Sequence, residues 1–170
     1  FDPLLRKAIL SLPTEDYAMV GDCHTAALVS RHGSIDWLCV PHFDSAACFA
    51  ALLGTADNGH WSISPVEPSR RIRRRYREGT LILETEFETE SGSVTLMDCM
   101  TPRNETPDLL RVVVGTRGQV QMNLELVVRF DSGSVVPWVR RTENGLSAIA
   151  GPGKVRLRDQ VRRRGGHVTN

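Results

Sequence analysis

The sequence lacks several features on which common classes of protein depend. Its 170 residues contain no apolar run near the ~18 residues that a membrane-spanning helix requires. Only two of its 21 basic residues, Lys7 and Lys154, are lysines, and 20 acidic residues leave a net charge of +1. A charge this close to zero gives no general attraction to nucleic acid or to an anionic membrane. We therefore expect neither as a partner.

Cysteine is scarce, and its spacing matches no zinc ribbon or zinc finger. The cysteines lie among apolar neighbours, which is typical of small buried hydrophobic residues: Cys23, Cys39, Cys48 and Cys99. His24 and His42 could join Cys39 as metal ligands, but this pattern lacks a fourth ligand. We therefore predict reduced thiols, a cytoplasmic location, and no metal or other cofactor.

Motifs of familiar catalytic sites are also missing. There is no Gly-x-Ser-x-Gly nucleophile elbow and no glycine-rich phosphate-binding loop. Glycoside cleavage needs two facing carboxyl groups, but spacing pairs no two of the candidate acids, which are Asp16, Asp22, Asp36, Asp44 and Asp98. Single acids beside turns usually bond to the backbone, so we assign no catalytic residue. The residues alone leave open whether the chain is an enzyme.

What the sequence does contain is a period-two alternation of apolar and polar residues. The alternating stretches are short and are separated by turns that contain Gly, Asn or Pro. This pattern predicts an all-β protein with an antiparallel β-sandwich. Strands are expected at Tyr17–Val20, Thr25–Ser30, Ile35–Val40, Thr80–Thr89, Val94–Met100, Leu109–Thr116, 120–130, Val135–Arg141 and Leu146–Ala150.

The turns predict how some strands pair. We expect 109–116 and 120–130 to form a hairpin across Arg117-Gly118, and 135–141 to pair with 146–150 around an Asn-Gly turn. One or two short helical segments are also expected. One of them is Cys48–Leu53, because Gly54 follows it and glycine commonly ends helices.

The chain divides into three parts. Residues 1–12 form an N-terminal extension whose apolar spacing predicts a helix, and residues 13–157 form the sandwich. Residues 158–170 are rich in arginine and poor in apolar side chains, as in a truncated or divergent tail. A sandwich that stops there leaves an unpaired edge.

A run of arginines from Arg70 to Arg77 is the strongest local charge feature. If this run is a strand, its arginines can meet Glu84, Glu86 and Glu88 of a neighbouring strand in a ladder of ion pairs. Nucleic-acid binding would favour interleaved aromatic residues, and only Tyr76 is present. We favour the ladder over an anion-binding patch.

Several motifs carry a specific family resemblance. They are EDYAMVGDCHTAALV at 15–29, GSIDWLC at 33–39, PHFDS at 41–45, RRYREGTL at 74–81 and VPWVRR at 136–141. Together they resemble the trehalase-like N-terminal domain of bacterial glycoside hydrolase family 15, which contains trehalases and glucoamylase-like enzymes. The resemblance runs from about residue 13 to residue 155 and so covers most of the chain.

This resemblance implies a super-sandwich-like fold, truncated here, that precedes a separate helical (α/α)6 barrel. In the family, two glutamates of the barrel hydrolyse an α-glucosidic bond with inversion. None of the barrel's catalytic motifs falls on these residues. The implied role is a non-catalytic domain that supports the barrel, with its own C-terminal catalytic domain as partner, an α-glucoside bound through that domain, and possible homo-oligomers.

The resemblance also directs attention to the stretch from Trp37 to Ser45. Sugar subsites combine a stacking ring with a hydrogen-bonding carboxylate, and Trp37, Phe43 and Asp44 offer these groups in a stretch expected to lie outside regular strands. The alternative is that both aromatic rings belong to the core. A stand-alone carbohydrate-binding or oligomerisation module is the alternative for the whole chain.

Overall fold

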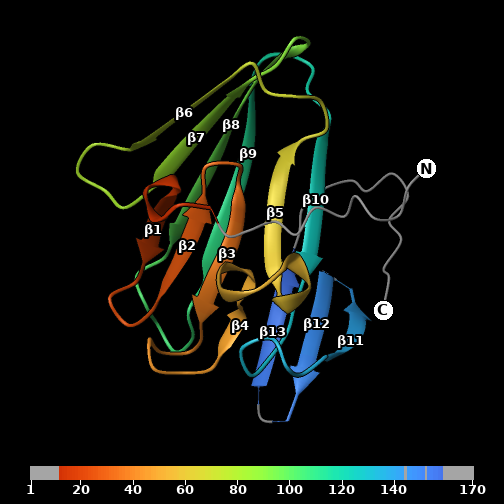
Figure 1. Cartoon of the computed structure of the whole chain (residues 1–170). Coiled ribbons are helices and arrows are strands. Elements are labelled where there is room, and N and C mark those ends of the chain that lie inside the picture. Colours follow the sequence, from red (N-terminus) through yellow and green to blue (C-terminus); the bar gives the residue numbers. More distant parts are fainter. Residues whose placement is uncertain (1–11, 144, 152, 159–170) are drawn as a thin grey trace.

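A computed structural model describes residues 12–143, 145–151 and 153–158. Two larger antiparallel sheets face each other, and a smaller third sheet lies at one end of the pair (Figure 1). Three 3₁₀ helices occur in the described residues, at Thr14–Asp16, Ala51–Leu53 and Ala56–Asn58. None of the described helices is long and apolar enough to cross a membrane.

The first sheet has the strand order β1-β2-β3-β5-β10, with β4 paired to β3. Its strands are β1 (Tyr17–Gly21), β2 (Ala26–Ser30), β3 (Ser34–Cys39), β4 (Ala47–Phe49), β5 (His60–Pro65) and β10 (Met122–Val127). The second sheet has the order β6-β7-β8-β9, and the third β11-β12-β13. Their strands are β6 (Arg71–Tyr76), β7 (Leu83–Glu88), β8 (Gly92–Met100), β9 (Leu109–Gly118), β11 (Trp138–Thr142), β12 (Gly145–Ala150) and β13 (Gly153–Arg158).

The core lies between the two larger sheets. Its main cluster joins Val20, Val29 and Ile35 of the first sheet to Leu83 of the second, and a second cluster joins the inward residues of β5, β7 and β8. Alternation places these residues on the inner faces, as in any two-layer sandwich. The all-β sandwich predicted from the sequence is therefore confirmed.

Strand pairing differs from the prediction at one hairpin. β9 pairs with β8, whereas β10 pairs with β5 in the other sheet, so 109–116 and 120–130 do not form a hairpin. The chain crosses between sheets near Gly118 because the apolar residues of β10 pack against those of β5. The β11–β12 hairpin is confirmed, with Trp138 opposite Ile149. β5 and β13 were not predicted.

Two local expectations are partly wrong. The segment 48–53 is not one helical turn, because residues 47–49 form β4 and only 51–53 are helical before Gly54. Cys23 is exposed, whereas Cys39 and Cys48 are buried, and all four cysteines are free thiols. Of the predicted terminal segments, only Leu12 and Arg158 fall inside the described residues, and Arg158 ends β13.

The arginine ladder is confirmed at Glu84 and Glu86, whereas Glu88 pairs with Arg117 of β9 instead of an arginine of β6. Residues of β6 stand opposite residues of β7 in the register Arg71–Glu88, Arg73–Glu86 and Arg75–Glu84. Glu84 is the most buried of these acids, and its carboxylate lies 2.8 Å from Arg75 and 2.7 Å from Arg77. Hydrogen bonds from Arg77 and Arg75 lower the pKa of Glu84 in spite of an opposing effect of burial.

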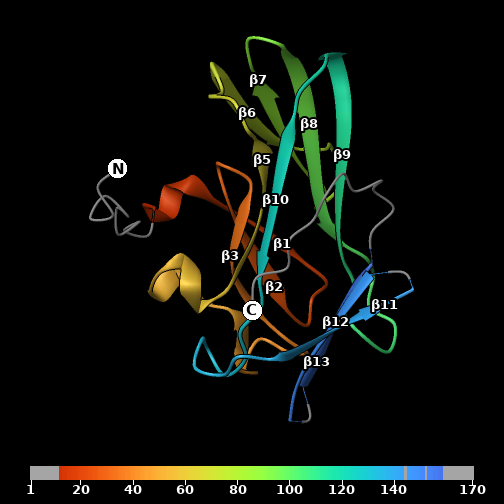
Figure 2. The same ribbon diagram turned by 90° about the vertical axis from the view of Figure 1, so that its right-hand side faces the viewer.

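The two lateral sides of the sandwich are closed to different degrees. On the β1–β6 side, the Tyr76 hydroxyl donates to the carbonyl of Met19 and accepts its N–H, at 2.9 and 3.0 Å. On the other side, β9 and β10 end their sheets (Figure 2). There, Val113 of β9 and Leu124 of β10 are paired with core residues yet are 42% and 47% exposed. Within the described part of the chain, the core is thus open along this side.

Arg111 of β9 joins the two sheets from within. Its side chain and that of Asp98 on β8 are both fully buried, with Nε 2.7 Å from the carboxylate. The same guanidinium donates to the carbonyl of Gly33 at 2.7 Å and to that of Trp61, and it lies over the Trp61 ring. Because Gly33 and Trp61 belong to the first sheet and its turn, this cation fixes the distance between the sheets.

Candidate functional site

The candidate site is a cluster of three loops, which join β1 to β2, β3 to β4, and β8 to β9. The first of these loops begins at Asp22, directly after β1. Its fully buried carboxylate accepts the backbone N–H groups of His24 at 3.0 Å and Thr25 at 2.8 Å. Asp commonly closes turns in this way. The turn places Cys23 at a φ of 71°, and Cys23 and His24 are exposed.

Arg103, from the β8–β9 loop, links Asp22 to the β3–β4 loop. Its Nε lies 2.8 Å from the Asp22 carboxylate, and its Nη2 donates to the carbonyl of Pro41 at 2.7 Å. Burial alone would raise the pKa of Asp22, but hydrogen bonds from Arg103 and the two backbone N–H groups lower it to about 2. Asp22 is therefore a structural anion rather than a general acid.

The β3–β4 loop is held by further backbone contacts. The N–H of Phe43 donates to the carbonyl of His24 at 3.0 Å, and the N–H of Ser45 donates to the carbonyl of His42 at 3.1 Å. The N–H of His42 donates in turn to the Ser45 hydroxyl. These bonds fix the loop backbone while the side chain of Phe43 is 60% exposed.

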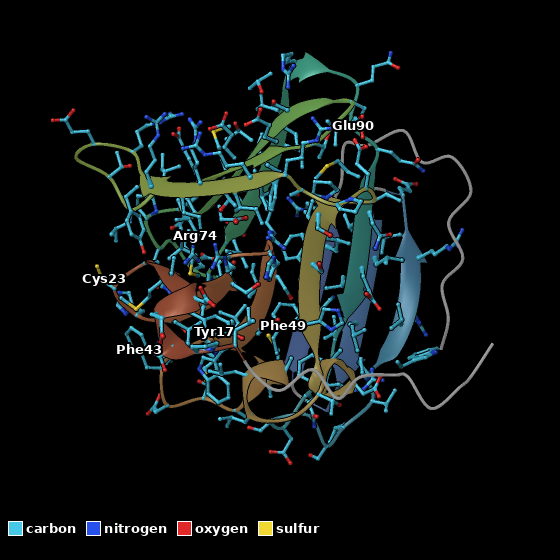
Figure 3. The ribbon with its side chains drawn as sticks, turned by 45° about the horizontal axis from the view of Figure 1, so that its top comes forward. Tyr17, Cys23, Phe43, Phe49, Arg74 and Glu90 are labelled. Atoms are coloured by element: carbon cyan, nitrogen blue, oxygen red, sulfur yellow. The ribbon has the colours of Figure 1, made fainter. Side chains whose placement is uncertain are left out.

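The structure places the three predicted site residues differently. Phe43 and Asp44 lie in the exposed β3–β4 loop, and Figure 3 shows Phe43 and Cys23 at the same end of the molecule. Trp37 instead lies within β3, half-buried against a small cluster that contains Cys39 and Ala47. The predicted strand over Ile35–Val40 is therefore confirmed at Trp37, whereas the expectation that this residue belongs to a stretch outside regular strands is wrong.

The exposed groups of the cluster suit contact with a polar ligand or a neighbouring domain. Phe43 offers an apolar ring, Asp44 an acceptor, and His24 and His42 two imidazoles with ring centroids 6.1 Å apart. An exposed ring on a fixed loop can stack on a sugar. In the described part of the chain, no group of three or more His, Cys, Asp or Glu side chains could hold a metal ion.

Sequence reasoning missed the residue that organises this cluster. Arg103 lies 81 positions from Asp22 in a polar loop between β8 and β9. Nothing in its neighbourhood distinguishes it from other surface arginines. Asp22 itself was considered as a candidate acid, and only the fold reveals that its carboxylate is already occupied.

The fold and the loop cluster together define an antiparallel β-sandwich domain with an exposed loop cluster at one end. A family model described as trehalase-like, N-terminal, matches residues 8–159. The chain therefore belongs to the family of trehalase-like N-terminal domains. This confirms the resemblance seen in the sequence.

Individual relatives agree with this family. The trehalase of Mycolicibacterium smegmatis is 41% identical over 88 residues, which are 52% of this chain and 13% of the relative. Trehalase 1 of Sulfolobus acidocaldarius is 33% identical over 131 residues, which are 76% of this chain and 22% of the relative. The matched regions thus span at most about a quarter of these relatives. No solved structure matches the chain.

Proposed function

We propose that this chain is the non-catalytic N-terminal domain of an inverting α-glucoside hydrolase of the trehalase or glucoamylase type. Its role is to support a separate catalytic domain and to present the β3–β4 loop to it. The family supports a glycoside hydrolase N-terminal domain. The free thiols fit the reducing conditions of the cytoplasm.

The main support for this proposal is that the buried carboxylates are already paired with arginines. Among the described residues, the buried carboxylates are Asp22, Glu84 and Asp98, and each is paired with arginine. A glycosidase needs one carboxylic acid with a raised pKa that reaches the leaving oxygen, and a second carboxylate across the bond. Hydrogen bonds lower the pKa of Asp22 and Glu84. Burial raises the pKa of Asp98, but this carboxylate is fully enclosed and hydrogen-bonded to Arg111. None of the three is therefore an accessible acid that could protonate a leaving oxygen, so we place the chemistry on other polypeptide.

The open side of the sandwich gives independent support. Val113 and Leu124 belong to the inner faces but are largely exposed, and β9 has no neighbour on its outer side among the described strands. Unpaired edges with apolar side chains are usually covered in stable proteins. A contiguous catalytic domain would cover this side and remove the edge.

A chimeric enzyme tests the proposal. Residues 13–157 of this chain would replace the matching N-terminal segment of the Mycolicibacterium smegmatis trehalase, and trehalose hydrolysis would be measured. We expect an active chimera. Phe43→Ala in the chimera should lower kcat/KM about tenfold, roughly the effect of losing one good ring contact, with an unchanged melting temperature.

Leu53→Ala is the matched control, because Leu53 is also exposed but lies outside the loop cluster. It should leave both activity and melting temperature unchanged. The proposal fails if the catalytic part is fully active without any N-terminal domain. The role of Phe43 fails if its loss leaves kcat/KM unchanged or only lowers stability.

The exposed edge of β9 also favours a second candidate function, which is self-association. Two copies could pair along β9 and extend the second sheet across the interface. Sedimentation of the chain alone distinguishes the two functions. A stable dimer that Val114→Lys abolishes would favour the oligomerisation module, and a monomer would favour the supporting domain.

A further inference from the structure

The outer face of the first sheet carries a polar groove that the proposed function does not use. Strand alternation turns Trp61 and Ile63 of β5 toward the core, so His60, Ser62 and Ser64 line the outer side. The register places Ser34 of β3 and Glu125 of β10 directly beside Ser62. Side chains directly opposite one another share a face, so these three form a polar row across the sheet.

The groove is large enough for a small molecule. Its volume is about 580 Å³, within the range usual for ligand pockets. The helical segments that contain Ala51 and Ala56 border it on one side, and Pro65, Val66 and Ile72 form an apolar rim at the other. A polar floor with an apolar rim is suited to a ligand that has both hydroxyl groups and C–H faces.

Hydrogen bonds fix the acceptors of the groove. The Tyr17 hydroxyl donates to Oδ2 of Asp36 at 2.8 Å, and the Ser34 hydroxyl donates to Oδ1 of the same carboxylate. His60 contacts the carbonyl of Ala56 through Nδ1 at 2.9 Å. Because a carbonyl only accepts, Nδ1 carries the proton, and Nε2 faces the Glu125 carboxylate at 3.5 Å.

The charges of the residues that line the groove indicate which class of ligand it can bind. Among the residues that the structure describes, the lining includes the carboxylates of Asp36, Glu67 and Glu125 but no lysine or arginine. Such a surface repels phosphates and carboxylates. It offers many acceptors, together with serine hydroxyls that can donate, and this set matches the hydroxyl groups of a neutral sugar.

We propose that this groove is a second carbohydrate-binding site, specific for a neutral α-glucoside and separate from the loop cluster. The choice of an α-glucoside rests on the proposed function, whereas the neutral, donor-rich ligand class rests on the groove itself. Sugar hydroxyls would donate to the carboxylates of Asp36 and Glu125. The C–H face of the ring would lie against Pro65 and Val66.

Backbone amide NMR of the full 170-residue chain, titrated with trehalose and with maltose, tests this site. We expect the amides of Ser34, Asp36 and Ser62 to shift, with a millimolar dissociation constant for at least one sugar. Ser62→Leu fills the groove from its floor without touching the core, and it should weaken binding at least tenfold. Ser62→Ala, the matched small variant, should weaken binding no more than about threefold.

Two further measurements separate this proposal from its competitors. Phe43→Ala, in the loop cluster, should leave the sugar-induced shifts of the groove amides unchanged. The chimera therefore tests the proposed function, the NMR titration tests the groove, and the failure of one can be told from the failure of the other. Spermidine serves as the cationic probe. The proposal is wrong if neither sugar shifts the groove amides, if Ser62→Leu does not alter the shifts, or if only spermidine binds.

Discussion

Replacing Arg111 with methionine is expected to lower the free energy of unfolding by about 3–5 kcal/mol. Methionine keeps much of the apolar length of the side chain, but it leaves the Asp98 carboxylate buried without a partner. It also removes the hydrogen bonds to Gly33 and Trp61 that join the sheets. Urea unfolding monitored by tryptophan fluorescence measures the loss.

The double variant Arg111→Met/Asp98→Leu separates the ion pair from simple packing. If the unpaired carboxylate is the main cost, the double variant should be more stable than Arg111→Met alone. Arg73→Met is the matched surface control, because Arg73 pairs with Glu86 in the exposed ladder and its side chain is 54% exposed. It should lose at most about 1 kcal/mol. If Arg111→Met and Arg73→Met lowered the free energy of unfolding equally, this would contradict the role of buried Arg111 in joining the two sheets.

Replacing Arg103 with methionine is expected to cost about 2–4 kcal/mol and to loosen the loop cluster. The variant leaves the buried Asp22 carboxylate with only its backbone donors, and it frees the carbonyl of Pro41. The amide of Phe43 should then exchange faster with solvent, because its bond to His24 depends on the position of the loop. Hydrogen exchange followed by NMR would show this local effect beside the global loss.

The same ion pair predicts a pH dependence. The pKa of Asp22 is lowered from its ordinary 3.8 to about 2, so the ionised form stabilises the fold above the ordinary value. This contribution, roughly 2 kcal/mol, is fully present above about pH 5 and is lost as the pH falls toward 2. Asp22→Asn should reduce the loss of stability between pH 7 and pH 3 by about 1–2 kcal/mol.

The control for this pH dependence is Asp44→Asn, since Asp44 is exposed in the neighbouring loop. It should unfold with the pH profile of the original chain. An unchanged pH profile in Asp22→Asn would show that the Arg103–Asp22 pair does not stabilise the cluster.

The strands with clear alternation were predictable from the sequence, and the connections between sheets were not. β11 and β12 flank the predicted Asn-Gly turn, so both their existence and their pairing followed from local pattern. β10 alternates equally well, but its partner is β5, which is short and contains two serines and a terminal proline. Pairing across the sandwich depends on which inner faces fit together, and local pattern does not contain this information.

The candidate site was predictable only in part. Phe43 and Asp44 were proposed because an aromatic residue and an acid stand together in a turn-like stretch, and the structure places both on the surface. The supporting pair of Arg103 and Asp22 joins residues that are 81 positions apart, and the polar groove joins β1, β3, β5 and β10. Such long-range groupings are created by the topology, so no motif records them.

The most direct measurement is the release of glucose from trehalose and maltose by the purified chain, compared with the chimeric enzyme. We predict that the chain alone releases no glucose above the buffer rate at any pH between 4 and 8, whereas the chimera hydrolyses trehalose. Glucose release by the chain alone would contradict the account, because it would place the reacting carboxylates on the sandwich itself.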